Sequence, residues 1–64
     1  MEQTKILVVD GELVIRESLA GWLERDGYRV DKAESGETAL ERLKQEVFDV
    51  ILLDIQMDGM SGME

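Results

Sequence analysis

The fold is decided by the stretch Asp49-Val50-Ile51-Leu52-Leu53-Asp54, in which four apolar residues stand between two acids. An uninterrupted apolar run is typical of a strand covered on both faces, as in a parallel sheet. A second such run, Lys5-Ile6-Leu7-Val8-Val9, ends at the turn signal Asp10-Gly11. We therefore expect strands over about residues 4–9 and 49–54.

Between these two strands the apolar residues follow the helical period. Ile15 and Trp22 lie on one apolar stripe of a helix predicted over about residues 13–26, and we expect Trp22 to pack in the core. A second helix is predicted over about residues 36–46, with Ser35 as its N-cap. Each predicted helix thus connects one strand to the next.

The rest of the chain completes an alternating pattern. Residues 28–33 alternate apolar and polar, which is typical of a half-exposed strand at the edge of a sheet. Gly27 fits a helix end in the left-handed region, and residues 55–64, rich in Met and Gly, are predicted to form a loop. The order βαβαβ predicts one α/β domain with right-handed crossovers and a parallel sheet.

The composition excludes several classes of function. The chain has no Cys and no His, so disulfides, thiolate or imidazole metal sites and His-based acid–base chemistry are absent. Any metal must be a hard cation bound by oxygen. A net charge of −8 opposes binding to nucleic acid and to anionic membranes. No apolar run reaches the about 18 residues of a membrane span and no secretory signal is seen, so we expect a cytoplasmic protein.

Two acids follow the two apolar strands. Asp10 comes after the first and Asp54 ends the other, and ligands of parallel sheets bind beyond the carboxyl ends of the strands. If these strands are neighbours, the two carboxylates converge, with Glu12 close by. Mg²⁺ would relieve their repulsion, and a carboxylate beside it can attack a phosphoryl donor. Two other readings stay open: Asp10 before Gly is a common turn residue, and Glu12 suits a helix N-terminus.

Several motifs in order, at matching spacing, make the whole chain resemble the receiver domain of bacterial response regulators. They are Asp10-Gly11-Glu12 after Lys5-Ile6-Leu7-Val8-Val9, Gly27-Tyr28-Arg29-Val30, Ser35-Gly36-Glu37-Thr38-Ala39-Leu40, Phe48-Asp49-Val50-Ile51-Leu52-Leu53-Asp54, Met57, Gly59-Met60 and Gly62-Met63-Glu64. The resemblance implies the flavodoxin-like βαβαβ half of a receiver domain: a parallel three-stranded sheet of order 2-1-3 with helices on both faces.

The resemblance also implies a role in a two-component phosphorelay. Asp54 matches the aspartate that accepts a phosphoryl group from a histidine kinase or a phosphotransfer protein. Asp10 matches an acidic Mg²⁺ ligand, and Gln56 matches the position whose backbone carbonyl completes the protein's ligands. Such a domain is a signalling module and not an enzyme in the ordinary sense. Gly11 stands where the family usually has a second acid, so Mg²⁺ binding should be weaker; Glu12, one residue displaced, is a further candidate ligand.

The resemblance covers only the N-terminal half of the family's domain. Without further strands, residues 49–54 would form an exposed apolar edge, which invites pairing with another chain. We therefore expect a homo-oligomer, a disordered or aggregating fragment, or a piece of a longer protein. The specific expectation is a homodimer joined through this strand. An alternative function is a self-assembling structural or interaction module without phosphoryl chemistry, which Gly11 and the missing half favour. A weaker alternative is a small hydrolase or phosphatase that uses Asp54 as nucleophile, since its loop lacks a second acid–base carboxylate.

Overall fold

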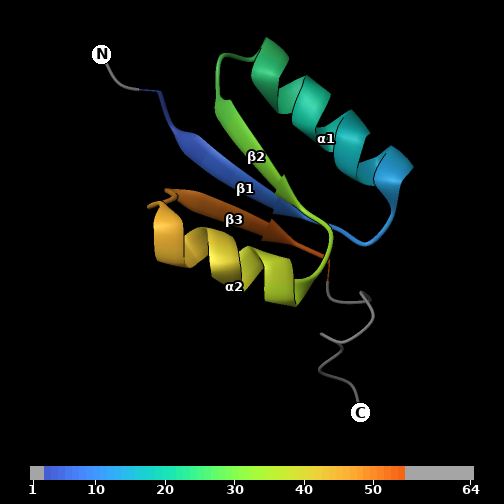
Figure 1. The fold of residues 1–64 in the computed structure, drawn as a ribbon. Helices are drawn as coiled ribbons and strands as arrows, with labels where there is room; N and C mark the ends of the chain where they lie inside the picture. Colours follow the sequence, from blue (N-terminus) through green and yellow to red (C-terminus); the bar gives the residue numbers. More distant parts are fainter. Residues whose placement is uncertain (1–2, 55–64) are drawn as a thin grey trace.

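The computed structural model describes residues 3–54, in which strands and helices alternate (Figure 1). The elements are β1 (Lys5–Val9), α1 (Leu13–Arg25), β2 (Arg29–Ala33), α2 (Gly36–Gln45) and β3 (Val50–Leu53). The strands are parallel and their order is β2-β1-β3, which confirms the predicted α/β fold and the order 2-1-3. Neither helix has the length and hydrophobicity that crossing a membrane requires.

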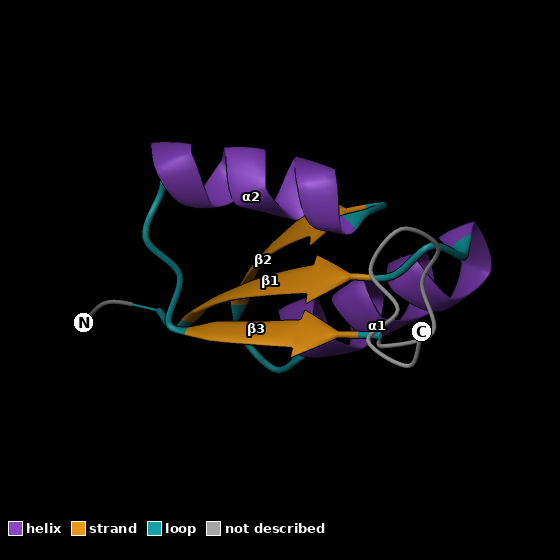
Figure 2. Cartoon of the chain, turned by 90° about the horizontal axis from the view of Figure 1, so that it is seen from below, coloured by secondary structure: helices purple, strands orange, loops and turns teal. Residues whose placement is uncertain are grey.

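The sheet lies between its two helices, with α2 on one face and α1 on the other (Figure 2). The central strand β1 is buried from Ile6 to Val9, because a strand with neighbours on both sides and a helix on each face meets little water. Its side chains alternate between the faces. Leu7 and Val9 join Ala33 and Ala39 in one buried cluster on the α2 side. The core is therefore centred on β1.

The helix boundaries follow from local sequence signals. The Ser35 hydroxyl accepts a hydrogen bond from the Thr38 backbone N–H at 3.2 Å, so the predicted N-cap of α2 is confirmed. After α1, Gly27 has a φ of 97°, a backbone conformation that glycine adopts without steric cost. This left-handed residue, also predicted, ends the helix and turns the chain into β2.

Ion pairs connect the edge strand β2 to both helices. Lys32 Nζ lies 3.0 Å from Glu17 Oε1 of α1, and Arg42 Nη1 of α2 lies 3.3 Å from Asp31 Oδ2. Asp31 and Lys32 are consecutive residues of β2 and so point to opposite faces of the sheet. Charged side chains along β2 also discourage pairing with another chain at that edge.

The prediction that Trp22 packs in the core is wrong. Its side chain is 71% exposed, and Ala20 is the one residue of α1 that is buried. The cause is the position of the helix: both helices approach β1 and β2 most closely, and neither comes as near to β3. The apolar stripe of α1 is therefore wider than the sheet surface beneath it.

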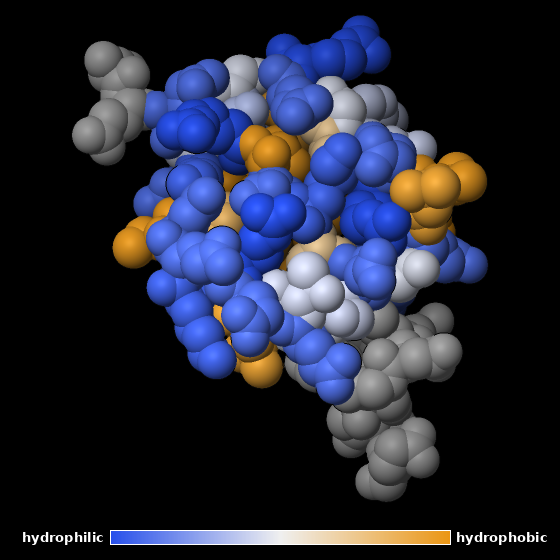
Figure 3. All heavy atoms as spheres, in the orientation of Figure 1, coloured by the Kyte–Doolittle hydropathy of each residue, from blue (hydrophilic) through white to orange (hydrophobic). Residues whose placement is uncertain are grey.

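The strand β3 forms an exposed apolar edge. Among residues 3–54 its one partner strand is β1, and its four residues are between 38% and 47% exposed. Ile51 lies beside Leu7 and Leu53 beside Val9. All four residues of β3 are apolar and consecutive ones point to opposite faces, so apolar side chains project from both faces of this edge. Figure 3 shows separate hydrophobic patches within a largely hydrophilic face of the molecule. The expected cover on both faces of this strand is absent because the helices lie over β1 and β2, whereas the expected exposed edge is confirmed.

Candidate functional site

The backbones of Asp10 and Asp54 lie at neighbouring positions at the carboxyl end of the sheet. The Asp54 N–H donates to the Val9 carbonyl at 3.0 Å, and the Asp10 N–H donates to the Ala33 carbonyl at 3.1 Å. The sheet ladder thus continues one residue beyond the strands. Because the strands are parallel, the two acids leave the sheet at the same edge, where parallel sheets bind their ligands.

Asp10 is the one charged or polar residue that is buried within residues 3–54, with 5% of its surface exposed. Its Oδ1 accepts a hydrogen bond from the Glu12 N–H at 2.9 Å, the local pattern by which an aspartate closes a turn. The Glu12 carbonyl in turn accepts from the Arg16 N–H at 2.9 Å, in the first turn of α1. One oxygen of the Asp10 carboxylate is therefore fixed by the chain that follows it.

A cation that the sequence analysis did not identify also reaches this edge. Arg16 Nη1 donates to the Asp10 backbone carbonyl at 2.7 Å, so the guanidinium extends from the first turn of α1 to the residue after β1. The guanidinium is a planar group with several N–H donors. The sequence signal that could have found it is spacing, because Arg16 lies four residues, about one helical turn, after Glu12.

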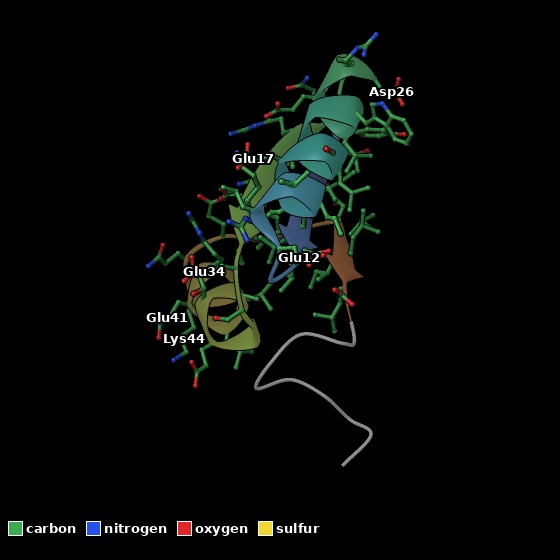
Figure 4. The ribbon with its side chains drawn as sticks, turned by 90° about the vertical axis from the view of Figure 1, so that its right-hand side faces the viewer. Glu12, Glu17, Asp26, Glu34, Glu41 and Lys44 are labelled. Carbon is green, nitrogen blue, oxygen red and sulfur yellow. The ribbon has the colours of Figure 1, made fainter. Side chains whose placement is uncertain are left out.

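Glu12 and Gly11 form the turn between β1 and α1. Figure 4 shows Glu12 at this turn, at the end of the sheet where β3 also ends. Glu12 is exposed, and the described part of the chain contains no group of three acids that could hold a metal ion. Gly11 is also exposed. Gly27 is the one described glycine with a positive φ, so Gly11 has a φ that residues with a side chain can adopt.

The donors at this edge fit a hard cation. Asp10 and Asp54 offer only carboxylate oxygens, and Mg²⁺ characteristically binds one or two carboxylates while it keeps several waters and phosphate oxygens. Asp10 and Asp54 are the residues that would hold it. Gln56, predicted to add a backbone carbonyl, lies outside the described residues, as does the whole predicted loop 55–64.

Comparison with known proteins gives a consistent set of relatives. The model of the response regulator receiver domain family matches residues 6–64. The transcriptional regulatory protein ResD of Bacillus subtilis is 47% identical over 62 residues, which cover 97% of this chain and 26% of ResD. The transcriptional regulatory protein ZraR of Klebsiella oxytoca is 43% identical over 67 residues, 98% of this chain and 14% of ZraR.

A third relative is named as a sensor histidine kinase and not as a transcriptional regulatory protein. The sensor histidine kinase AruS of Pseudomonas aeruginosa is 45% identical over 60 residues, which cover 94% of this chain and 6% of AruS. No solved structure matches the chain. The chain thus spans about a quarter or less of the length of these three relatives.

Proposed function

The chain belongs to the response regulator receiver domain family, and on this premise we propose that it is a phosphoacceptor module of a two-component phosphorelay, with Asp54 as the residue that is phosphorylated. Receiver domains are signalling modules that interact with histidine kinases or phosphotransfer proteins. The observation that carries the proposal is the ladder bond from the Asp54 N–H to the Val9 carbonyl. It brings Asp54 beside Asp10, at the edge where a parallel sheet binds phosphate-bearing ligands.

In the proposed reaction, an oxygen of the Asp54 carboxylate attacks the phosphorus of a phosphohistidine. The new P–O bond forms as the P–N bond breaks, and the imidazole leaves with the electron pair and takes up a proton from solvent. Most of the catalysis in phosphoryl transfer is positioning and charge neutralisation. Mg²⁺, when bound, would neutralise charge on the phosphoryl oxygens. Asp10, Asp54 and the Gln56 carbonyl would hold it, with Glu12 as a further candidate ligand.

Direct phosphorylation tests this function. The 64-residue chain is incubated with Mg²⁺ and acetyl phosphate, a small phosphodonor that needs no partner protein, and its intact mass is followed with time. We expect one added phosphoryl group, dependent on Mg²⁺ and removed by hydroxylamine, because hydroxylamine cleaves acyl phosphates. No incorporation, or a phosphoryl group that survives hydroxylamine, would contradict the assignment.

The remaining features of the proposal concern place and partners. We place the module in the cytoplasm and expect its phosphodonor to be a histidine kinase or a phosphotransfer protein. A net charge of −8 disfavours direct contact with nucleic acid, so we propose no such contact. The readings as a structural module without phosphoryl chemistry and as a small hydrolase are not favoured, because the family match extends over residues 6–64.

We also propose that the chain self-associates through β3, which within the described residues is paired on one side and carries apolar residues on both faces. A twofold pairing of β3 with a second β3 would satisfy its free edge and cover these residues.

Light scattering after size exclusion should give the mass of a dimer. Ile51→Lys should yield a monomer, since a lysine on an edge strand blocks pairing. Val47→Lys should remain a dimer, because Val47 is 86% exposed and lies outside the strand. A wild-type chain that is monomeric and folded by circular dichroism would contradict this pairing.

A further inference from the structure

Asp10 is held by hydrogen bonds to three different parts of the chain. Its backbone N–H donates to Ala33 at the end of β2. Its Oδ1 accepts from the Glu12 N–H, and its backbone carbonyl accepts from the Arg16 guanidinium at 2.7 Å. Asp10 is also 5% exposed, so little water competes for these groups. The carboxylate can therefore take few directions as long as all three bonds are made.

The bond from Arg16 differs from the other two because its donor is a charged side chain, whereas the other two donors are backbone N–H groups. A hydrogen bond with a charged partner is shorter and stronger than one between neutral groups, which holds for the Arg16 bond and also for the bond to the Asp10 carboxylate. The bond also spans the β1–α1 turn: Arg16 belongs to α1, and the carbonyl that it contacts belongs to Asp10, the residue directly after β1. The two ends of the turn that contains Gly11 and Glu12 are thus joined by this bond.

We propose that Arg16 is a positioning residue that fixes Asp10, and through it the direction of the Asp10 carboxylate, at the acidic edge of the sheet. The effect of Arg16 on Mg²⁺ binding rests on the proposed function, because Asp10 is a metal ligand only in that proposal. Partners that orient a metal ligand without touching the metal typically change metal affinity by about 10–100-fold when removed. Arg16 contacts only the backbone carbonyl of Asp10, so the Asp10 carboxylate can still accept from the Glu12 N–H and bind a metal ion.

The test compares wild type with Arg16→Ala, Arg16→Lys and the control Arg25→Ala. Arg25 is an exposed arginine at the other end of α1. Its replacement by alanine changes the net charge by the same amount and removes the same kind of side chain from the same helix. Two readouts are followed by NMR: exchange of the Glu12 amide with solvent in the metal-free chain, and a Mg²⁺ titration monitored at the Gly11 and Asp54 amides. Thermal unfolding is measured in parallel for each variant.

For Arg16→Ala we expect faster exchange of the Glu12 amide and a Mg²⁺ dissociation constant raised by about tenfold or more. Arg25→Ala should leave both unchanged, and Arg16→Lys, which keeps a charged donor, should recover most of the affinity. If the bond from Arg16 to Asp10 serves stability alone, its loss in Arg16→Ala will lower the unfolding temperature and leave the Mg²⁺ dissociation constant of the folded chain unchanged. That result, or equal losses in Arg16→Ala and Arg25→Ala, would overturn the proposal.

Failure of this inference and failure of the proposed function give different results. If wild type takes no phosphoryl group from acetyl phosphate but the Arg16→Ala effects on the Glu12 amide and on Mg²⁺ are seen, the function is wrong and the positioning role holds. If wild type is phosphorylated at Asp54 while Arg16→Ala changes neither readout, the function holds and Arg16 does not position Asp10. A wild-type chain without Mg²⁺ affinity would overturn the metal-binding consequence.

Discussion

Replacement of Asp54 by Asn is expected to reduce phosphoryl incorporation from acetyl phosphate by at least about 100-fold, because the variant lacks the proposed nucleophile. The amide oxygen of Asn is neutral and a poor nucleophile, although its side chain has nearly the shape of the carboxylate. The ladder bond to Val9 uses the backbone N–H of residue 54 and survives the change. Intact-mass spectrometry over time measures the rate, and circular dichroism checks the fold.

The matched control is Asp49→Asn, at the other end of the same strand. Asp49 Oδ2 accepts a hydrogen bond from the Lys5 backbone N–H at 2.8 Å, and an asparagine oxygen can still accept it. This variant should be phosphorylated as wild type is. Equal losses in both variants would mean that the effect reports damage to β3. Wild-type labelling of Asp54→Asn would show that another residue is the acceptor.

The second large effect is an increase in Mg²⁺ affinity. Replacement of Gly11 by Asp is expected to lower the Mg²⁺ dissociation constant by about tenfold or more, which corresponds to about 1.4 kcal/mol. The new carboxylate would stand directly after Asp10, at the edge of the sheet where Asp54 also lies. Gly11 is exposed, and its φ is one that residues with a side chain adopt. The change should therefore cost little stability.

The control for this gain is Gly11→Ala, which stiffens the same turn but adds no charge. The Mg²⁺ dissociation constant of each variant is measured by titration, with the amide shifts of residues 10–12 as the signal. Alanine should leave the constant close to that of wild type. If Asp and Ala variants bind Mg²⁺ equally well, the turn does not direct a residue-11 side chain toward the metal, and the absence of an acid there is not what limits binding.

Much of the fold could be predicted because its signals are local. The apolar runs before Asp10 and Asp54, the N-cap at Ser35 and the left-handed Gly27 each depend on a few neighbouring residues, and the structure contains all of them. That Asp10 and Asp54 leave the sheet at the same edge also followed from their positions after parallel strands. The strand order 2-1-3 needed the resemblance to receiver domains, since periodicity alone does not say which strands are neighbours.

What sequence reasoning missed depends on tertiary geometry. Trp22 lies on an apolar stripe, but the stripe does not reveal how little of the sheet α1 covers. Arg16 reads as a solvent-facing charge, and its bond to the Asp10 carbonyl exists only because the β1–α1 turn brings the helix back over the strand end. The roles of Gln56 and Glu12 as metal ligands stay predictions.

The way β3 is attached has a consequence for the timing of the proposed phosphorylation. β2 is tied to both helices by ion pairs, whereas β3 is held by β1 and neither helix comes close to it. Segments with few buried contacts open first in local unfolding, so β3 should separate from β1 more often than β2 does. Each opening would carry Asp54 away from Asp10. The fraction of time in which the acceptor is ready would then be an equilibrium population, and whatever binds the free edge of β3 would raise it.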